Sequence, residues 1–415
     1  MNQRQRLVTY RPFAAAFCFA ALLSLISVAV QSRTFNPSLA GSAGLDFQSA
    51  VVQRTSLASA KWLDIVPGSF EFFSVYPTKD KSSGTVTVDC NKGESINQAL
   101  TKSPHVRNLT VEISGLCHEN VVVTRDHVTL HGTDPANDGI QADLSAEITD
   151  VALWVRQAQL VTVENLKLTG GFSGLLVTNV TLDSLRLINC RLESNGAYGA
   201  QLQNALVVAQ DSTLSTNGNI NAGVFGGSRF QCTGCTLADP QGTGALGTIR
   251  ANAFAFTANR VLLTNCTLTN GGITSDDSLI LLTDSSISGF GSGAQTIFAF
   301  GSSSVALTRV QVTGSMVFNQ GANAQLLGVT QTSSLINQMD DSAYVRIGDA
   351  SPAVGGPPSI PSMVKGFTLR NFSKATLLQT SQITGNLNCI QGADAFCSTP
   401  TNVSGTSNCS LCPKP

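Results

Sequence analysis

The sequence predicts an all-β protein in which short parallel strands stack as a solenoid, and three observations predict it. A pattern of alternating apolar residues on both sides of a central residue recurs seven times between residues 161 and 312. Its centres advance by roughly 24 residues (144 residues in six steps, from Asn165 to Arg309), which suits one rung of a solenoid and is too short for a propeller blade. Charged residues make up only 12% of the chain, about half the level of an ordinary globular protein.

The centre of each repeat is predicted to be a sharp corner between two strands. Asparagine, aspartate and glycine tolerate the left-handed backbone of such a corner at low cost, and arginine suits it least. The seven centres are Asn165, Asn189, Asp211, Gly234, Asn265, Asp284 and Arg309.

Four positions in each repeat are predicted to face inward. Counted from the centre, they are positions −4, −2, +1 and +3. Alternation with a period of two buries one face of each strand. Of these positions only Ser212 and Ser285 are polar. Stacked rungs would bury a continuous apolar row that no single rung could bury. Each rung also shows a second inward strand, where we expect the phenylalanines Phe254, Phe256, Phe298 and Phe300 to fill the core.

The chain divides into four predicted parts: residues 1–32, 33–85, 86–385 and 386–415. The first is an export signal or an N-terminal anchor, because Arg4, Arg6 and Arg11 precede an apolar run at residues 13–30. We therefore expect a secreted, periplasmic or cell-surface protein that meets a membrane only if this segment is uncleaved. The net charge of −1 offers no electrostatic case for binding nucleic acid.

The other three parts are a leader segment, the solenoid and a cysteine-rich tail. Near the start of the solenoid, residues 93–103 place Ile96, Ala99 and Leu100 on one face of a short helix. Such a helix would cover the open end of the stack. The tail is too small to have a core of its own, so we expect disulfides to hold it against the solenoid.

The cysteines suit an oxidising compartment. Removing the signal with Cys18 leaves an even number. Disulfides are predicted at the two ends, between Cys90 and Cys117 and as two bonds within the set Cys389, Cys397, Cys409 and Cys412. The four rung cysteines, Cys190, Cys232, Cys235 and Cys266, are expected to stay reduced. A bond between Cys235 and Cys266 is permitted if their rungs are adjacent. The CTGC spacing of Cys232 and Cys235 also fits a redox pair, but a redox pair needs an exposed thiolate.

With its repeated corner asparagines, the chain resembles the right-handed parallel β-helix superfamily with the pectin lyase-like fold. The resemblance covers roughly residues 86–385, and residues 109–123 and 127–132 resemble the opening rungs of pectin methylesterase-like chains. That fold carries lyases, hydrolases, esterases, epimerases, phage tailspikes and proteins without catalysis. The resemblance therefore implies an architecture and no specific enzyme family.

Four residues are candidates for catalysis. Asp276 and Asp277 resemble the paired aspartates of polygalacturonases, where one carboxyl protonates the leaving oxygen and others activate water. His118 and Glu119 belong to a group of histidines and carboxylates near the start of the solenoid, a combination that binds metals or transfers protons. The spacing of that group matches no metal motif, so we predict no metal and no cofactor. No lysine, glutamate or histidine lies between residues 212 and 338, which argues against a standard enzyme of these groups.

Outward residues of the second strand form a candidate carbohydrate site: Trp154, Arg156, Gln201, Gln203 and Phe225. An aromatic ring, a guanidinium and amides can stack on a sugar and bond its hydroxyls. The prediction is a secreted or surface-attached protein that binds a polysaccharide or cell-wall glycan, or acts as a structural or adhesive rod, without strong catalysis. The alternative is a divergent polysaccharide lyase, epimerase or hydrolase that acts on uronic-acid polymers.

Overall fold

The computed structural model describes residues 82–144, 150–242, 251–291, 295–349, 361–399 and 402–412, apart from the side chains of residues 182–183. The chain separates into two compact units, Met1–Pro77 and Thr78–Pro415. The first unit lies outside the described residues, and so do the predicted export signal and nearly all of the leader. Within the described ranges, no helix has the length and apolar character needed to cross a membrane.

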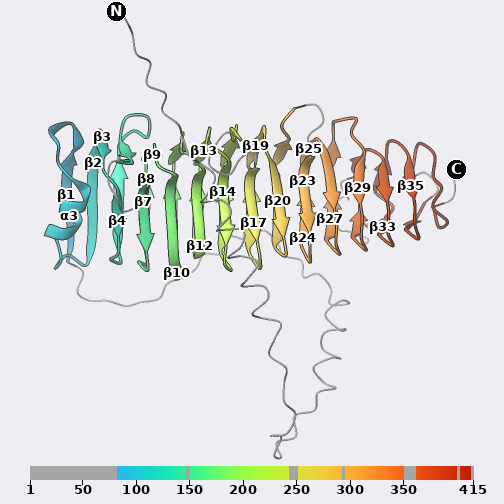
Figure 1. The fold of residues 1–415 in the computed structure, drawn as a ribbon, viewed down its shortest axis with the longest axis horizontal. Helices are drawn as coiled ribbons and strands as arrows, with labels where there is room; N and C mark the ends of the chain where they lie inside the picture. Colours follow the sequence, from blue (N-terminus) through green and yellow to red (C-terminus); the bar gives the residue numbers. More distant parts are fainter. Residues whose placement is uncertain are drawn as a thin grey trace, which may run out of the picture. The chain divides into compact units, whose positions relative to one another are not determined.

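The second unit is a parallel β-helix with three strands in a complete rung, in agreement with the predicted fold class (Figure 1). We number its faces sheets 1, 2 and 3 in the order in which the chain visits them. Sheet 1 contains β1 (Ser83–Asp89), β2 (Asn108–Ser114), β5 (Val128–Gly132), β8 (Thr162–Glu164), the second halves of β10 (Ser173–Ile188) and β12 (Tyr198–Gln210), β15 (Arg229–Thr233), β18 (Arg260–Thr264), β21 (Leu279–Thr283), β24 (Ser304–Thr308), β27 (Asn323–Leu327), β30 (Tyr344–Ile347), β33 (Lys374–Leu377) and β36 (Asp394–Cys397).

Sheet 2 is made of short strands: β3 (Leu116–His118), β6 (Gly139–Gln141), β9 (Lys167–Thr169), β11 (Arg191–Glu193), β13 (Thr213–Ser215), β16 (Thr236–Ala238), β19 (Thr267–Thr269), β22 (Ser286–Ser288), β25 (Gln311–Thr313), β28 (Thr330–Gln331), β31 (Ser362–Val364) and β34 (Ser381–Ile383). Sheet 3 contains β4 (Val121–Val123), β7 (Val151–Arg156), the first halves of β10 and β12, β14 (Ile220–Phe225), β17 (Ala251–Phe256), β20 (Gly272–Asp276), β23 (Gln295–Phe300), β26 (Ser315–Phe318), β29 (Asn337–Met339), β32 (Phe367–Leu369) and β35 (Leu387–Cys389).

The predicted corners lie between sheets 1 and 2. All seven centre residues have a left-handed backbone, with φ between 49° and 70°. Asn189 donates its side-chain amide to Asn165 of the preceding rung over 2.8 Å. Arg309, the least suitable residue by its own preference, is held by a bidentate ion pair with Asp284, the corner of the rung before it. Side-chain chemistry and contacts between rungs therefore both shape this row of corners.

The predicted inward positions of sheets 1 and 2 are all buried, which confirms their register. The two serines among them satisfy backbone groups. The Ser212 hydroxyl accepts the N–H of Cys190 over 3.0 Å, and the Ser285 hydroxyl accepts that of Cys266 over 3.0 Å. Each serine also donates to a carbonyl two residues earlier in its own chain. These bonds offset the cost of burying a hydroxyl.

A ladder of buried asparagines lines the turn between sheets 2 and 3, and the repeat pattern did not predict it. Asn195 donates to Asn217 (3.0 Å), Asn217 to Asn221 (2.8 Å) and Asn221 to Asn252 (2.8 Å), each through its side-chain amide. These three amides and that of Asn252 also donate to backbone carbonyls of the rungs beside them. The ladder therefore adds side-chain donors to these carbonyls, of which those of Ala238 and Thr269 also accept backbone N–H groups.

A 3-10 helix, η1 (Cys90–Lys92), and one α-helix, α3 (Ile96–Lys102), follow β1. The apolar side of α3 is buried as its spacing predicts, with Ile96, Ala99 and Leu100 facing the core. Figure 1 shows α3 beside β1 at the blue end of the stack. A disulfide joins Cys90 and Cys117, with a Cα–Cα distance of 4.8 Å, which is the predicted pairing.

Parallel strands continue beyond residue 385, where the sequence pattern places the start of the tail. β35 and β36 pair with β32 and β33 of the preceding rung. Disulfides Cys389–Cys409 and Cys397–Cys412 then fasten residues 402–412 to these strands. The four tail cysteines thus form two bonds among themselves, as predicted. These bonds join the last described residues covalently to the final rung.

Candidate functional site

The outward side of sheet 3, from β7 to β23, carries all five residues of the predicted carbohydrate site. We call this surface the aromatic face. Strand register aligns its side chains in two rows. One row contains Trp154, Leu176, Gln201, Gly223, Phe254, Thr274 and Phe298. The other contains Arg156, Thr178, Gln203, Phe225, Phe256, Asp276 and Phe300.

The prediction that the phenylalanines of β17 and β23 fill the core is wrong, because they face outward. Ala253 and Ala255 take the inward positions of β17, where they stack on Ala222 and Val224 of the preceding rung. One alternation of β17 is alanine and the other combines the buried Asn252 with Phe254 and Phe256, so its own pattern does not show which side is inside. The neighbouring rung decides the register, because a shift by one residue would reverse every side chain.

Aromatic rings touch one another across the rungs of this face. Ring centroids are 5.9 Å apart for Phe172 and Tyr198, 6.0 Å for Tyr198 and Phe225, and 6.1 Å for Phe225 and Phe254. The Phe254 ring stacks on the Phe256 ring with a centroid distance of 6.4 Å, and Phe256 is 42% exposed. These distances lie within the range of favourable aromatic pairs.

The glycine in the first row makes room for this chain of rings. A Cβ at Gly223 would lie 2.8 Å from ring atoms of both Phe225 and Tyr198. Burial raises the pKa of Tyr198 to about 12, so its hydroxyl stays protonated at physiological pH. The rings Phe298 and Phe300 form a second pair farther along the face, with centroids 5.2 Å apart.

Trp154 begins the face and is already engaged with its neighbours. Its indole N–H donates to the hydroxyl of Thr178 over 3.0 Å. The guanidinium of Arg156 lies over the Trp154 ring, 5.4 Å from the centroid, a distance typical of cation–π contacts. Gln201 is likewise held by the hydroxyl of Ser173 at 3.1 Å. These contacts fix the orientation of the Trp154 and Gln201 side chains.

A hollow of 680 Å³ adjoins the start of the aromatic face. It lies beside α3, and Val122, one of its lining residues, is the register partner of Trp154 in the next rung. His105, Arg107 and His127 also line it. The hollow therefore lies beside the start of the face, and Asp126 lines it together with the basic side chains.

The structure places Asp276 within the aromatic face and Asp277 at the turn that follows. Asp276 aligns with Phe256 on one side and Phe300 on the other. Burial, and then the charge of Asp277, raise the pKa of Asp276 above the ordinary carboxyl value. Asp277 accepts the backbone N–H of Ser302 over 2.6 Å. A carboxyl with a raised pKa among aromatic rings is suited to hold or donate a proton.

The other two catalytic candidates lie elsewhere, near α3. The Glu119 carboxylate accepts hydrogen bonds from the Ser95 hydroxyl (2.8 Å), the Ile96 N–H (2.6 Å) and the Asn97 side-chain amide (2.9 Å). It thereby bonds the first turn of the helix, a stabilising place for a carboxylate. His118 is exposed at the end of β3. The structure does not bring these two residues to the aspartates.

Sequence reasoning missed a pair of arginines on the outward side of sheet 1. Arg229 and Arg260 are register partners on neighbouring strands, and no ion pair involves either of them among the described residues. Burial, and then the charge of Arg260, lower the pKa of Arg229. Both arginines stand five residues before a corner, Gly234 or Asn265. Because the two arginines have the same distance in sequence from their corners, the sequence could have predicted that they align on neighbouring strands.

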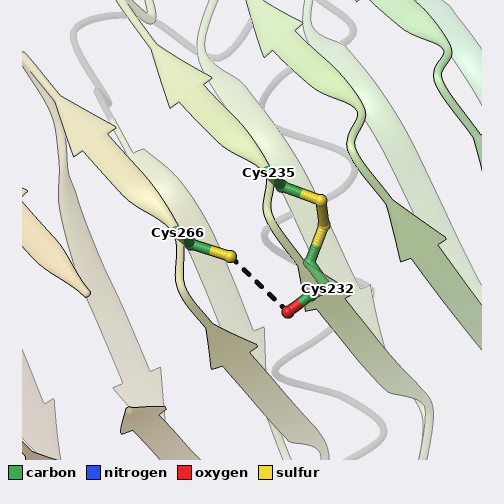
Figure 2. Close-up of side chains that lie close together, drawn as sticks. All are labelled: Cys232, Cys235 and Cys266. Atoms are coloured by element: carbon green, nitrogen blue, oxygen red, sulfur yellow. Dashed lines mark hydrogen bonds between the residues drawn. A yellow bond between two sulfur atoms is a disulfide. The ribbon is translucent and has the colours of Figure 1, made fainter. Parts of the chain in front are cut away.

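The prediction that all rung cysteines stay reduced is wrong for two of them. Cys232 and Cys235 form a disulfide across the Gly234 corner, with a Cα–Cα distance of 6.0 Å (Figure 2). The corner folds the chain back, so inward residues on its two sides come within bonding reach. Cys190 and Cys266 are free and buried, as predicted. Because the disulfide occupies two of the three clustered sulfurs, only Cys266 offers a thiol in this state.

Comparison with known proteins supports the fold. The family described as the right handed beta helix region matches residues 120–287. No curated protein sequence matches the chain.

Several solved structures are similar to this chain at low identity. The catalytic domain of a GH87 alpha-1,3-glucanase in complex with tetrasaccharides is 12% identical over 81% of this chain and 70% of that one, with a TM-score of 0.40. Tailspike protein 2 from Escherichia coli O157:H7 bacteriophage CAB120 is 12% identical over 72% and 42%, with a TM-score of 0.33. The A-module of a mannuronan C-5 epimerase from Azotobacter vinelandii is 13% identical over 75% and 93%, with a TM-score of 0.30. Such identities and scores carry nothing about activity. The family match over residues 120–287 and the stacked parallel rungs support the resemblance to the right-handed parallel β-helix superfamily.

Proposed function

We propose that the aromatic face binds an extended glycan and that the protein acts as a secreted or surface-attached binding or adhesive rod. The observation that supports this most directly is the line of touching rings from Phe172 to Phe256, which crosses successive rungs and remains partly exposed. A soluble protein rarely exposes a long apolar stripe without a partner for it. A sugar ring offers such a stripe both apolar C–H faces and hydroxyl groups.

The polar groups on the same face suit a sugar ligand. Gln201 and Gln203 present amides one or two rungs from an aromatic ring, and Arg156 presents a guanidinium over the Trp154 ring of its own rung. Rungs repeat about every 4.8 Å. An extended polymer can therefore contact several rungs in turn without entering a deep pocket. The low charge of the chain and its basic, apolar N-terminus agree with export to where such polymers occur.

Binding to a glycan array tests this proposal, with neutral and uronic-acid polymers included. We expect Phe256→Ala and Trp154→Ala each to weaken binding by about 1–2 kcal/mol, or roughly 5- to 30-fold. Thr236→Ala is the matched control, because Thr236 is an outward residue of sheet 2. Its affinity should equal that of the parent. If no glycan binds the parent, or if both ring variants bind as the parent does, the proposal fails and a structural rod remains.

A second candidate function is slow cleavage, elimination or epimerisation of the bound polymer, with Asp276 as the proton-transferring group. Its position between Phe256 and Phe300, together with its raised pKa, favours this candidate. The test measures new reducing ends, unsaturated sugars and altered uronic-acid configuration after incubation with each polymer. Asp276→Asn should abolish any such product while binding persists. Equal product from Asp276→Asn and the parent would remove Asp276 from the reaction.

A further inference from the structure

Three sulfur atoms meet inside the core at the Gly234 corner. The sulfurs of Cys232, Cys235 and Cys266 all lie within 4.8 Å of one another, and all three residues are buried (Figure 2). We propose that they form an internal thiol–disulfide exchange site. In it, Cys235 bonds either to Cys232 of its own rung or to Cys266 of the next rung.

Strand register identifies Cys235 as the sulfur that changes partner. Cys235 and Cys266 directly precede β16 and β19, whose first residues, Thr236 and Thr267, are register partners. The Thr267 N–H donates to the Cys235 carbonyl over 2.9 Å. Neighbouring residues on adjacent strands are about 4.8 Å apart, within the Cα–Cα range of disulfides. Cys232 instead aligns with Leu263. Cys232 and Cys266 therefore lie on opposite sides of the row of corners and are not register partners.

The exchange balances without an external oxidant or reductant. The Cys266 thiol gives up its proton, and the thiolate attacks the Cys235 sulfur. A Cys235–Cys266 bond forms as the Cys232–Cys235 bond breaks, and Cys232 leaves as a thiolate that takes up a proton. The Cys266 thiol already donates toward the carbonyls of Thr264 (3.3 Å) and Cys232 (3.5 Å), which holds it beside the disulfide.

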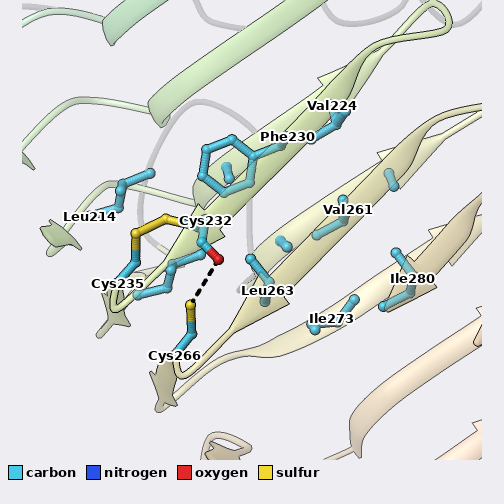
Figure 3. Packing of buried hydrophobic residues seen from close by; sticks show 14 of the residues in the cluster. Leu214, Val224, Phe230, Cys232, Cys235, Val261, Leu263, Cys266, Ile273 and Ile280 are labelled. Carbon is cyan, nitrogen blue, oxygen red and sulfur yellow. Dashed lines mark hydrogen bonds between the residues drawn. A yellow bond between two sulfur atoms is a disulfide. The ribbon is translucent and has the colours of Figure 1, made fainter. Parts of the chain in front are cut away.

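The surroundings make this exchange internal and pH-dependent. Figure 3 shows the three cysteines packed among apolar side chains that include Leu214, Phe230 and Leu263, and these exclude dissolved thiols. Burial also raises the pKa of Cys266, so its thiolate is scarce near neutrality. The exchange should therefore speed up as the pH rises. Its product ties two successive rungs together, whereas the Cys232–Cys235 bond stays within one rung.

Cys190 provides a matched control within the same row. It is a free, buried cysteine one residue after the Asn189 corner, as Cys266 is one residue after Asn265. Ser212 takes the corresponding position in the rung that follows Cys190. Cys190 therefore has no cysteine partner in that adjacent rung.

The test maps disulfides of the oxidised full chain by peptic digestion at acidic pH, where exchange is quenched. In Cys232→Ser, Cys235 and Cys266 should become linked, and in Cys266→Ser only the Cys232–Cys235 bond should remain at this corner. Cys190→Ser should give the parental map. A folded Cys232→Ser protein with free thiols at both Cys235 and Cys266 would overturn the proposal.

The parent chain gives a second measurement that needs no variant to fold. After incubation at neutral or mildly alkaline pH, the Cys235–Cys266 peptide should appear, and more of it at the alkaline pH. Circular dichroism before and after incubation establishes that the protein stays folded. Persistence of the Cys232–Cys235 bond alone, in folded protein at both pH values, would refute the exchange.

Discussion

Replacing one member of the buried asparagine ladder should destabilise the protein far more than replacing an exposed asparagine. Asn217 is fully buried and makes four side-chain hydrogen bonds. Its oxygen accepts the Asn195 backbone N–H (3.2 Å) and side-chain amide (3.0 Å). Its amide donates to the Leu192 carbonyl (3.0 Å) and to the side-chain oxygen of Asn221 (2.8 Å).

The size of the effect follows from the groups that Asn217→Ala leaves behind. The Asn195 side-chain amide keeps the Leu168 carbonyl as a partner. We count the Asn195 backbone N–H and the Asn221 oxygen as the two groups left unpaired. At about 1–3 kcal/mol for each buried group without a partner, the free energy of unfolding should fall by about 2–6 kcal/mol.

Urea unfolding followed by circular dichroism measures this loss. Asn323→Ala is the matched control, because Asn323 is exposed on β27 and its amide bonds only the nearby Gly321 carbonyl. We expect the control to change the free energy of unfolding by no more than about 0.5 kcal/mol. Equal unfolding midpoints for the two variants would show that the ladder does not stabilise the fold.

Three further predictions concern the register, the raised pKa and the helix. Leu187→Asp should prevent folding, because an unpaired charge would face the core, whereas Thr267→Asp on the outward side should be tolerated; similar yields of folded protein would contradict the register. The raised pKa of Asp276 means that the folded state prefers its protonated form, so this contribution to stability is lost as pH rises through that pKa. Asp276→Asn should therefore gain stability relative to the parent between acidic and neutral pH, and a constant difference in unfolding midpoint would contradict this. Glu119→Ala should raise the rate of hydrogen exchange at the Ile96 amide in α3, because the first turn of the helix loses an acceptor that stabilises it by about 0.5–2 kcal/mol. An unchanged exchange rate would show that the helix does not need the carboxylate.

Sheets 1 and 2 could be predicted closely because two independent signals agree there. Alternation identifies the inward side, and the corner residue identifies where the chain turns. Asn165 and Asp284 show this directly, since both adopt the left-handed backbone that their side chains favour. Even Arg309 follows the pattern, although its own preference does not, because Asp284 of the preceding rung binds it.

Sheet 3 was predicted only in part: the outward side was right for Trp154, Gln201 and Phe225 but wrong for the phenylalanines of β17 and β23. In β17 the alternating sets are alanines and aromatic or polar residues, and only stacking on Ala222 and Val224 shows that Ala253 and Ala255 face inward. The Cys232–Cys235 bond was missed for a related reason. Its two positions were predicted to face inward, but the distance between them depends on the three-dimensional course of the corner.

A comparison of the outward residues of sheets 2 and 3 explains why function should lie on sheet 3. Both sheets are parallel stacks with the same spacing between rungs, so folding makes similar demands on their outward positions. Sheet 2 fills its outward row with hydroxyl side chains at Thr213, Thr236, Thr267 and Ser286. Over the same rungs, sheet 3 places aromatic rings that include Phe225 and Phe256, at a cost in solubility that the fold does not require. The proposed glycan would cover these rings, and the ring variants on the glycan array test for it.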